Sequence, residues 1–364
     1  MQNQKETRFF IGSNSGRGFF SYFDFFYEPS EMKKVFLLKG GAGNGKSTLM
    51  GKIAEAALQK GYHVEKIYCP SDPSSLDAVR IRETGTAVID ATTPHAREAA
   101  MHGVLERYIS LSPYVSTDVQ AERANVEALT REVKACHEAA RKRLTGAYSA
   151  ATASLSMVLG GVDTAHLAKR GAALARKYLP VRPYAVRRPA KKRFLSGLTP
   201  EGVLAFPESL GVFASQNGMP VNQIAVWDRY GLSPFLLAPI LEAAEENGYE
   251  TATCYDPLVP ARLTALAIPE AGLLIAVQRD AVFDTSEHIR NIRLDDAIAP
   301  DVVKKSRARL KILHRAGTAL IEDGCECLAE ARRLHDQLEA VYRPYTDYEG
   351  LNRLADTLTA ECCR

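Results

Sequence analysis

Eight consecutive residues in the first half of the chain have the types and spacing of a phosphate-binding loop. The run Gly40-Gly-Ala-Gly-Asn-Gly-Lys46-Ser47 fits the pattern G-x-x-x-x-G-K-[ST]. Glycines let backbone N–H groups turn toward phosphate, and the positive end of a following helix attracts the same charge. We therefore expect ATP to bind through these residues: Gly40, Gly41, Ala42, Gly43, Asn44, Gly45, Lys46, Ser47 and Thr48.

The side chains of this loop and one later aspartate have distinct expected roles. Lys46 is expected to reach the β- and γ-phosphates, and Thr48 the α-phosphate. Asp90 ends the apolar run 86–90, where α/β sheets place ligands, so we expect Ser47 and Asp90 to hold Mg²⁺. The expected catalytic residues are Lys46, Asp90 and His95.

The group that activates water is not evident in the sequence. Ala91 follows Asp90, in place of the glutamate that many ATP-hydrolysing P-loop proteins carry. Either hydrolysis is slow or another group acts, and the candidates are His95, Thr92, Asp72 and Asp77. A purely structural role for His95 also stays open.

Two elements must position the loop. The apolar run Val35-Phe-Leu-Leu38 suits a buried parallel strand, and Gly61 closes a helix with one apolar face, formed by Leu49, Met50, Ile53, Ala56 and Ala57. Strand, loop and helix in this order predict an α/β fold of the P-loop NTPase type, with a parallel sheet flanked by helices.

The chain contains an internal duplication. At an offset of 187, residues 49–85 align without gaps on residues 236–272, with 15 of 37 positions identical. Shared apolar periodicity does not explain matched turn residues such as Gly61, Pro70 and Pro73. We expect a P-loop repeat with a helical arm at 1–180, a basic proline-rich linker at 181–192 and a degenerate repeat with its own arm at 193–364.

The second repeat lacks the chemistry of the first. Under the offset, Leu232 replaces Gly45, Ser233 replaces Lys46, Pro234 replaces Ser47 and Val277 replaces Asp90. These changes remove a flexible backbone position, a positive charge and both magnesium ligands, and Asp228 would repel phosphate. We therefore expect a single nucleotide site, in the first repeat.

Each repeat continues into a segment with an apolar helical stripe, at about 119–150 and 302–342. Such arms can form hairpins for a partner or a homodimer, or pack against the chain's own core.

Between the repeats, Lys169 to Arg193 contains ten positive and no acidic residues. This segment can bind nucleic acid, act as a solvated linker, or supply an arginine finger to the first site, as can Arg229.

Composition sets the outer limits. The 364 residues are 46% hydrophobic and 24% charged, as in globular proteins, and Met1–Glu6 has no apolar signal segment. We expect a cytoplasmic protein without a membrane span, with its seven cysteines reduced. The net charge of +3 is too small to identify a partner.

The segment from Arg8 to His95 resembles a bacterial family of tandem P-loop ATPase-like proteins, found mainly in Gram-positive bacteria. The resemblance rests on four motifs, Phe10-Ile-Gly-Ser-Asn14, Leu38 to Thr48, Cys69 to Asp77 and Val88 to His95, and extends in the second repeat from Arg193 to about Asp280. It implies ATP binding at the loop, with Asp72, Asp77 and His95 in the same site, and implies no substrate. This chain departs from relatives that keep a phosphate-binding loop in both repeats.

Together these features favour an ATP-binding protein that acts as a slow, Mg²⁺-dependent ATPase and conformational switch. A small-molecule kinase, with Asp72 or Asp77 as base, is one alternative. A regulator whose nucleic-acid binding is controlled by ATP is another, and a sensor that does not hydrolyse ATP is a third. The absence of an Asn-Lys-x-Asp motif favours adenine over guanine.

Overall fold

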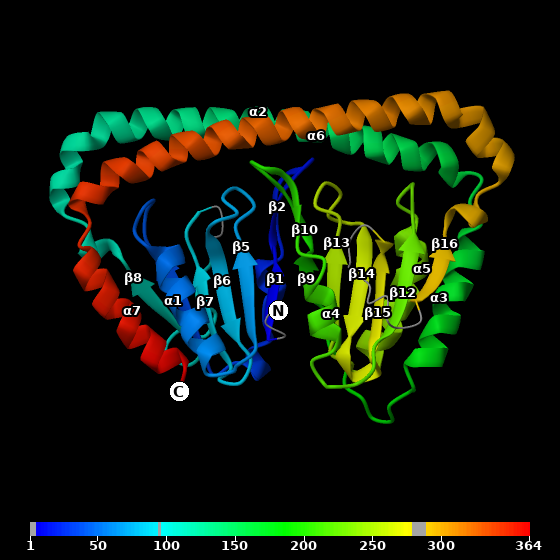
Figure 1. The fold of residues 1–364 in the computed structure, drawn as a ribbon, viewed down its shortest axis with the longest axis horizontal. Helices are drawn as coiled ribbons and strands as arrows, with labels where there is room; N and C mark the ends of the chain where they lie inside the picture. Colours follow the sequence, from blue (N-terminus) through cyan, green and yellow to red (C-terminus); the bar gives the residue numbers. More distant parts are fainter. Residues whose placement is uncertain (1–4, 94–95, 279–288) are drawn as a thin grey trace.

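The computed structural model describes residues 5–93, 96–278 and 289–364, which form an α/β structure with two six-stranded sheets side by side (Figure 1). The first sheet has the order β1-β5-β6-β7-β4-β8. Its strands are β1 (Glu6–Phe9), β5 (Val64–Tyr68), β6 (Leu76–Ile81), β7 (Thr86–Asp90), β4 (Lys34–Lys39) and β8 (Glu106–Ser110).

The second sheet has the equivalent strand order, β9-β13-β14-β15-β12-β16, in which β9 corresponds to β1 and β16 to β8. Its strands are β9 (Lys191–Phe194), β13 (Ala252–Tyr255), β14 (Leu263–Ile268), β15 (Leu273–Val277), β12 (Asn222–Trp227) and β16 (Ile289–Arg293). Each half also carries a small hairpin, β2 (Gly12–Ser15) with β3 (Gly18–Ser21), and β10 (Ser196–Thr199) with β11 (Gly202–Ala205). The α/β prediction is confirmed, and the matching strand orders agree with a duplicated chain.

The sheets are mixed, and the expectation of parallel sheets was wrong for one strand in each. β6 runs antiparallel to both β5 and β7, and β14 runs antiparallel to both β13 and β15. Only four residues, 82–85, join β6 to β7, and a parallel connection needs a crossover of a dozen or more. Gly85 closes this turn at φ 61°, and Gly272 closes the equivalent turn at φ 53°.

Helices flank each sheet. In the first half α1 (Lys46–Gln59) packs on β5 and β6, and in the second α5 (Ser233–Glu246) packs on β14. The short helix α4 (Ser209–Ala214) contacts β1 and β14, and so lies between the two sheets.

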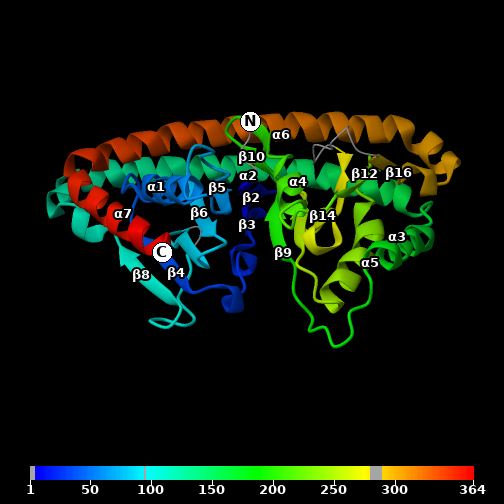
Figure 2. The same ribbon diagram turned by 60° about the horizontal axis from the view of Figure 1, so that its bottom comes forward.

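Two long helices bridge the halves. α2 (Arg123–Leu159) leads from the first half toward the second, and α6 (Pro300–Tyr342) returns alongside it, as Figures 1 and 2 show from two directions. Gly146 and Gly324 permit the close approach, because a Cβ at either position would lie 2.9 Å from a leucine of the other helix. The two predicted arms therefore pack on each other.

The helices that follow the bridge lie on the opposite half. α3 (Thr164–Tyr178), which precedes the second repeat in sequence, packs on α5 of that repeat. α7 (Tyr348–Cys362), at the end of the chain, packs on α1 of the first repeat. A Cβ on Gly171 would lie 2.2 Å from the Leu236 carbonyl oxygen, so α3 and α5 approach each other closely. Each half is thus covered in part by a helix, α3 or α7, that follows one of the two long bridging helices in sequence.

The two halves share a core and buried ion pairs. Phe10 and Phe194 exchange backbone hydrogen bonds of 2.9 and 2.7 Å where the ends of β1 and β9 meet. Aromatic residues of both halves surround this contact, among them Phe9, Tyr22, Phe206 and Phe213. The halves are therefore fixed to each other by packing as well as by chain connection.

Charged residues of the basic segment from Lys169 to Arg193 contribute to this interface. Lys191 lies 2.9 Å from Glu31 and 2.7 Å from Glu250, and Arg193, only 1% exposed, pairs with Glu65. Burial opposes ionisation of Glu31, but Lys191 and then Arg188 overcome it and lower the pKa of its carboxyl group to about 2.

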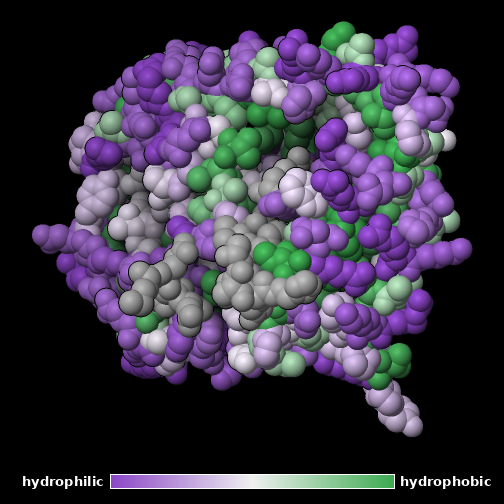
Figure 3. All heavy atoms as spheres, turned by 45° about the vertical axis from the view of Figure 1, so that its right-hand side comes forward, coloured by the Kyte–Doolittle hydropathy of each residue, from purple (hydrophilic) through white to green (hydrophobic). Residues whose placement is uncertain are grey.

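None of the helices described has the length and apolar character that a membrane span requires. Hydrophilic residues make up most of the face seen in Figure 3, and hydrophobic ones form small patches between them.

Candidate functional site

The loop between β4 and α1 has the backbone geometry that its glycines allow. Gly43 and Gly45 have φ values of 69° and 70°, in the left-handed region that strains other residues. The Leu49 N–H donates to the Gly45 carbonyl at 2.9 Å, so α1 begins directly after the loop. The chain therefore turns sharply from a buried strand into a helix N-terminus, where backbone N–H groups lack intrahelical partners.

Lys46 and Asp90 come together at this turn. The Lys46 ammonium group donates to the carbonyl oxygens of Gly40 and Gly41 at 2.8 and 2.7 Å. Its Nζ lies 3.7 Å from Asp90 Oδ2, and both side chains are largely buried. Asp90 is in reach because β7 lies beside β4, with Leu38 paired to Asp90. The Thr92 backbone N–H and hydroxyl both donate to the other Asp90 oxygen.

The hydroxyl of Ser47 faces a neighbouring loop, whereas Thr48 is exposed. Ser47 Oγ accepts the Leu76 N–H at 2.9 Å, which ties α1 to the segment after β5. In that segment Asp72 accepts hydrogen bonds from Ser74 and Ser75, and Arg332 of α6 lies 2.9 Å from Asp72 Oδ1. Burial opposes ionisation of Asp72, but the two serines and Arg332 outweigh it and lower its pKa.

A carboxylate from the far end of the chain contacts the phosphate-binding loop. The Gly43 N–H donates to Glu339 Oε1 at 3.3 Å, and a Cβ on Gly43 would lie 3.2 Å from the Glu339 carbonyl oxygen. Tyr348, at the start of α7, donates weakly to the Gly43 carbonyl at 3.5 Å. A hydrogen bond with His335 and the Gly43 N–H lower the pKa of Glu339 despite partial burial. An ionised oxygen therefore lies where the expected phosphate contact would be.

The equivalent loop of the second repeat binds its own carboxylate. Asp228 Oδ1 accepts the N–H groups of Tyr230, Gly231 and Leu232 at 3.2, 2.8 and 2.9 Å, and Oδ2 accepts that of Ser233 at 2.7 Å. Leu232 has φ −85°, in contrast to φ 70° at Gly45. The start of α5 is thus still an anion-binding turn, filled from within the chain.

Other residues singled out from the sequence lie elsewhere or are already paired. His95 falls outside the described residues, and Asp77 is buried in β6. Arg229 lies 3.7 Å from Asp295 in the second half. Five cations of the basic segment pair with glutamates: Arg182, Arg187, Arg188, Lys191 and Arg193.

Sequence reasoning missed Glu339, Arg332 and Tyr348. They contact the first-repeat site from helices that begin more than 200 residues after it. The apolar stripe at about 302–342 predicts the helix around Glu339, but such a stripe does not indicate which loop the polar residues of the helix contact. The one sequence signal for these contacts is that charged residues lie near the end of the predicted helical segment at about 302–342.

No protein-family model, curated protein or solved structure matches this chain.

Proposed function

We propose that this chain binds ATP at residues 40–48 and acts as a slow ATPase whose nucleotide state is transmitted to the bridging helices. The supporting observation is that both equivalent loops donate to a carboxylate from the backbone: the Gly43 N–H to Glu339 in one repeat, and four N–H groups to Asp228 in the other. A loop that accepts a carboxylate in this way is suited to phosphate, which carries more charge and more acceptor oxygens. Only the first loop adds a lysine.

Within this proposal Lys46 has a simple task. Its ammonium group exchanges the Gly40 and Gly41 carbonyl oxygens for phosphate oxygens, which are stronger acceptors because they are charged. Asp90, 3.7 Å away, holds the ammonium group beside the loop. Ser233, at the equivalent position of the second repeat, carries no charge, so we assign nucleotide binding to the first repeat alone.

Ser47 and Asp90 fit the Mg²⁺ that accompanies ATP. Both offer oxygen donors: Ser47 lies in the first turn of α1, and Asp90 ends β7, the strand beside β4, which leads into the loop. Magnesium commonly takes one or two protein ligands and completes its shell with water and phosphate. Bound there, the ion supplies charge neutralisation at the phosphate oxygens.

The switch follows from the position of Glu339. A phosphate bound to the Gly43 N–H would compete with the carboxylate for the same donor, and two negative charges at that distance repel each other. Glu339 would then withdraw, and the end of α6 and the start of α7 would move with it. Because α6 runs back over the second half, a change at the loop can reach the degenerate repeat.

Amide hydrogen exchange tests both parts of the proposal. With MgATP, and not with AMP, we expect slower exchange at residues 43–47 and faster exchange at residues 339–348, together with slow phosphate release. Unchanged exchange at residues 43–47 would reject nucleotide binding. Slower exchange there without a change at 339–348 would reject the switch alone.

The two alternative functions differ in support. Pairing of the linker cations with glutamates reduces the charge available for nucleic acid, so that alternative is weaker. A small-molecule kinase stays a prediction, and it requires ADP formation to depend on an acceptor. Release of inorganic phosphate from ATP without an acceptor would favour the ATPase.

A further inference from the structure

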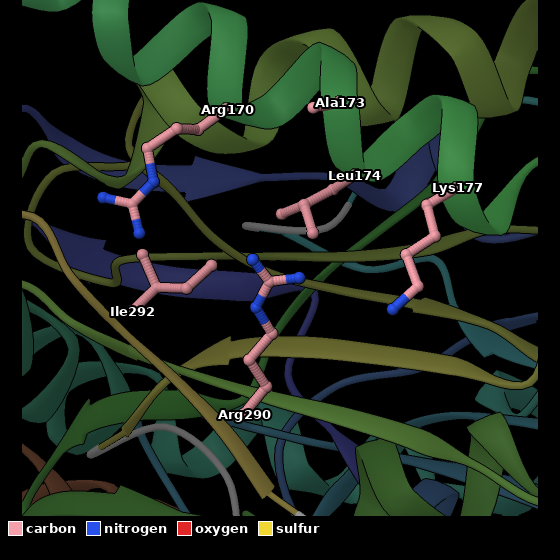
Figure 4. Close-up of a pocket in the computed structure, with 6 residues that line it drawn as sticks. All are labelled: Arg170, Ala173, Leu174, Lys177, Arg290 and Ile292. Carbon is pink, nitrogen blue, oxygen red and sulfur yellow. The ribbon is translucent and has the colours of Figure 1, made fainter.

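A cavity of about 230 Å³ lies between α3 and β16, the edge strand of the second sheet. Leu174 and Ile292 are its buried apolar residues, and Ala173 adds to the apolar lining. Its polar lining consists of three cationic side chains. In Figure 4 Arg290 extends from β16 toward the helix, while Arg170 and Lys177 extend from α3 toward the strand.

These three cations have no acidic partner among the residues that the structure describes. No carboxylate lines the cavity, and no ion pair involves Arg170, Lys177 or Arg290 in that part of the chain. The linker cations that follow α3 do pair with glutamates, for example Arg182 with Glu270 at 2.7 Å. The positive charge around the cavity is therefore not neutralised by these residues.

The corresponding place in the first half shows how such a position is neutralised internally. Val35 and Gln223 are equivalent positions, because their partners on the next strand, Ala87 and Leu274, are aligned by the offset of 187. On the edge strand Val35 pairs with Glu106 and Gln223 pairs with Ile289. The residues that follow, Arg107 of β8 and Arg290 of β16, are therefore counterparts. Asp347 caps α7 as Asp163 caps α3, so Glu361 is the counterpart of Lys177.

In the first half these two counterparts form an ion pair. Arg107 donates to Glu361 at 2.7 Å, and Lys34 lies 3.3 Å from the other oxygen of Glu361. By the same alignment, Leu354 is the counterpart of Arg170. The first half therefore has an ion pair and a leucine at the positions where the second half has three cations. Among the described residues the second half gains no ion pair from this exchange, only a contact of Lys177 Nζ with the Tyr178 ring at 4.7 Å, and bringing like charges together opposes folding.

We propose that Arg170, Lys177 and Arg290 form a binding site for a small organic phosphate, independent of the nucleotide loop. Guanidinium groups suit phosphate because their N–H donors match two oxygens at once. The apolar residues Leu174 and Ile292 would contact the organic part. A volume of about 230 Å³ is below the roughly 300–1,000 Å³ of pockets for drug-sized ligands, so the ligand is small.

Calorimetry measures binding at this site without a local reporter. We would titrate the full-length protein with phenyl phosphate and record the heat of binding, then repeat the titration with inorganic phosphate and with a single-stranded oligonucleotide. The expected result is saturable binding of phenyl phosphate, weaker binding of inorganic phosphate, and the same response in Lys46→Ala.

Lys177→Glu and Lys169→Glu form a matched pair of variants. Both reverse one charge on α3, but Lys169 does not line the cavity. Lys177→Glu copies the ion pair of the first half and should weaken phenyl phosphate binding about tenfold or more, the loss expected for a charged hydrogen bond. Lys169→Glu should change it by less than about twofold, as expected for screened surface charge. Arg170→Leu, which copies Leu354, should also weaken binding and serves if Lys177→Glu does not fold.

Several results would overturn the proposal. They are the absence of saturable binding in the wild type, equal weakening by Lys177→Glu and Lys169→Glu, and equal affinities for phenyl phosphate and inorganic phosphate. Binding of the oligonucleotide alone would replace the small ligand with a nucleic acid.

Discussion

Replacing Glu339 with glutamine removes the carboxylate charge from the loop and nearly keeps the size of the side chain. A hydrogen bond to a charged group contributes about 1.5–3 kcal/mol when well formed and buried. The contact with Gly43 is 3.3 Å long and the Glu339 side chain is 35% exposed, so its contribution should fall below this range, at about 1 kcal/mol. Loss of about 1 kcal/mol of competition corresponds to roughly fivefold tighter ATP binding.

Calorimetric titration of MgATP into the wild type and Glu339→Gln measures this difference. Glu330→Gln is the control, because Glu330 lies on the same helix and pairs with Arg333 at 2.6 Å, and no contact links it to the loop. The reasoning predicts tighter binding in Glu339→Gln and no change in Glu330→Gln. Unchanged or weaker ATP binding in Glu339→Gln would refute competition at Gly43.

The same variant separates two roles for this carboxylate. If Glu339 only competes with phosphate, turnover at saturating ATP should stay the same or rise in Glu339→Gln. If it activates water, kcat should fall by about 10²-fold or more, as for loss of a general base. The second outcome would supply the group that the sequence lacks after Asp90.

Three further predictions concern stability and the loop. Arg193→Ala should lower the free energy of unfolding by about 3 kcal/mol in urea titrations, because it removes the closest cation of the largely buried Glu65 carboxylate and leaves it only Arg80 at 3.6 Å, whereas Arg176→Ala, at an exposed position, should not. The pKa of the Glu31 carboxyl group is lowered from its ordinary value of 4.5 to about 2 in the folded chain. Ionised Glu31 therefore contributes its full stabilisation above pH 4.5, and this contribution is lost as the pH falls toward about 2. Glu31→Gln should flatten this part of a plot of unfolding free energy against pH. Gly45→Ala should weaken ATP binding and cost about 1 kcal/mol of stability, because alanine is strained at φ 70°; a melting temperature and an affinity equal to the wild type would contradict this.

The sequence predicts local features of this chain well. The glycine and lysine spacing predicts the turn between β4 and α1, and the apolar runs predict the buried strand and the helix on either side. The offset of 187 predicts two halves, which the structure contains as two sheets of equal strand order. Leu232 in place of Gly45 predicts a changed backbone, and the two residues do have φ values of opposite sign. These features depend on neighbours in sequence and on backbone sterics.

Features that depend on distant contacts could not be predicted. The orientation of β6 follows from the four-residue turn to β7, whose length depends on where the two strands end and not on the apolar pattern that indicates a parallel sheet. The position of Glu339 depends on how α2 and α6 pack over both halves, and their amphipathic stripes do not define the endpoint of either helix. Asp228 was expected to repel phosphate, but its use as an internal acceptor for four N–H groups emerged only from the structure.

The most direct test of the central claim is equilibrium binding of MgATP to the wild type, Lys46→Ala and Lys52→Ala. Lys52 lies on the same helix as Lys46 but is exposed and contacts Asn352 and Asp356 of α7. The account predicts saturable binding to the wild type, retention of that affinity in Lys52→Ala, and a loss of about tenfold or more in Lys46→Ala. Equal affinities of all three proteins, or no binding to the wild type, would contradict it.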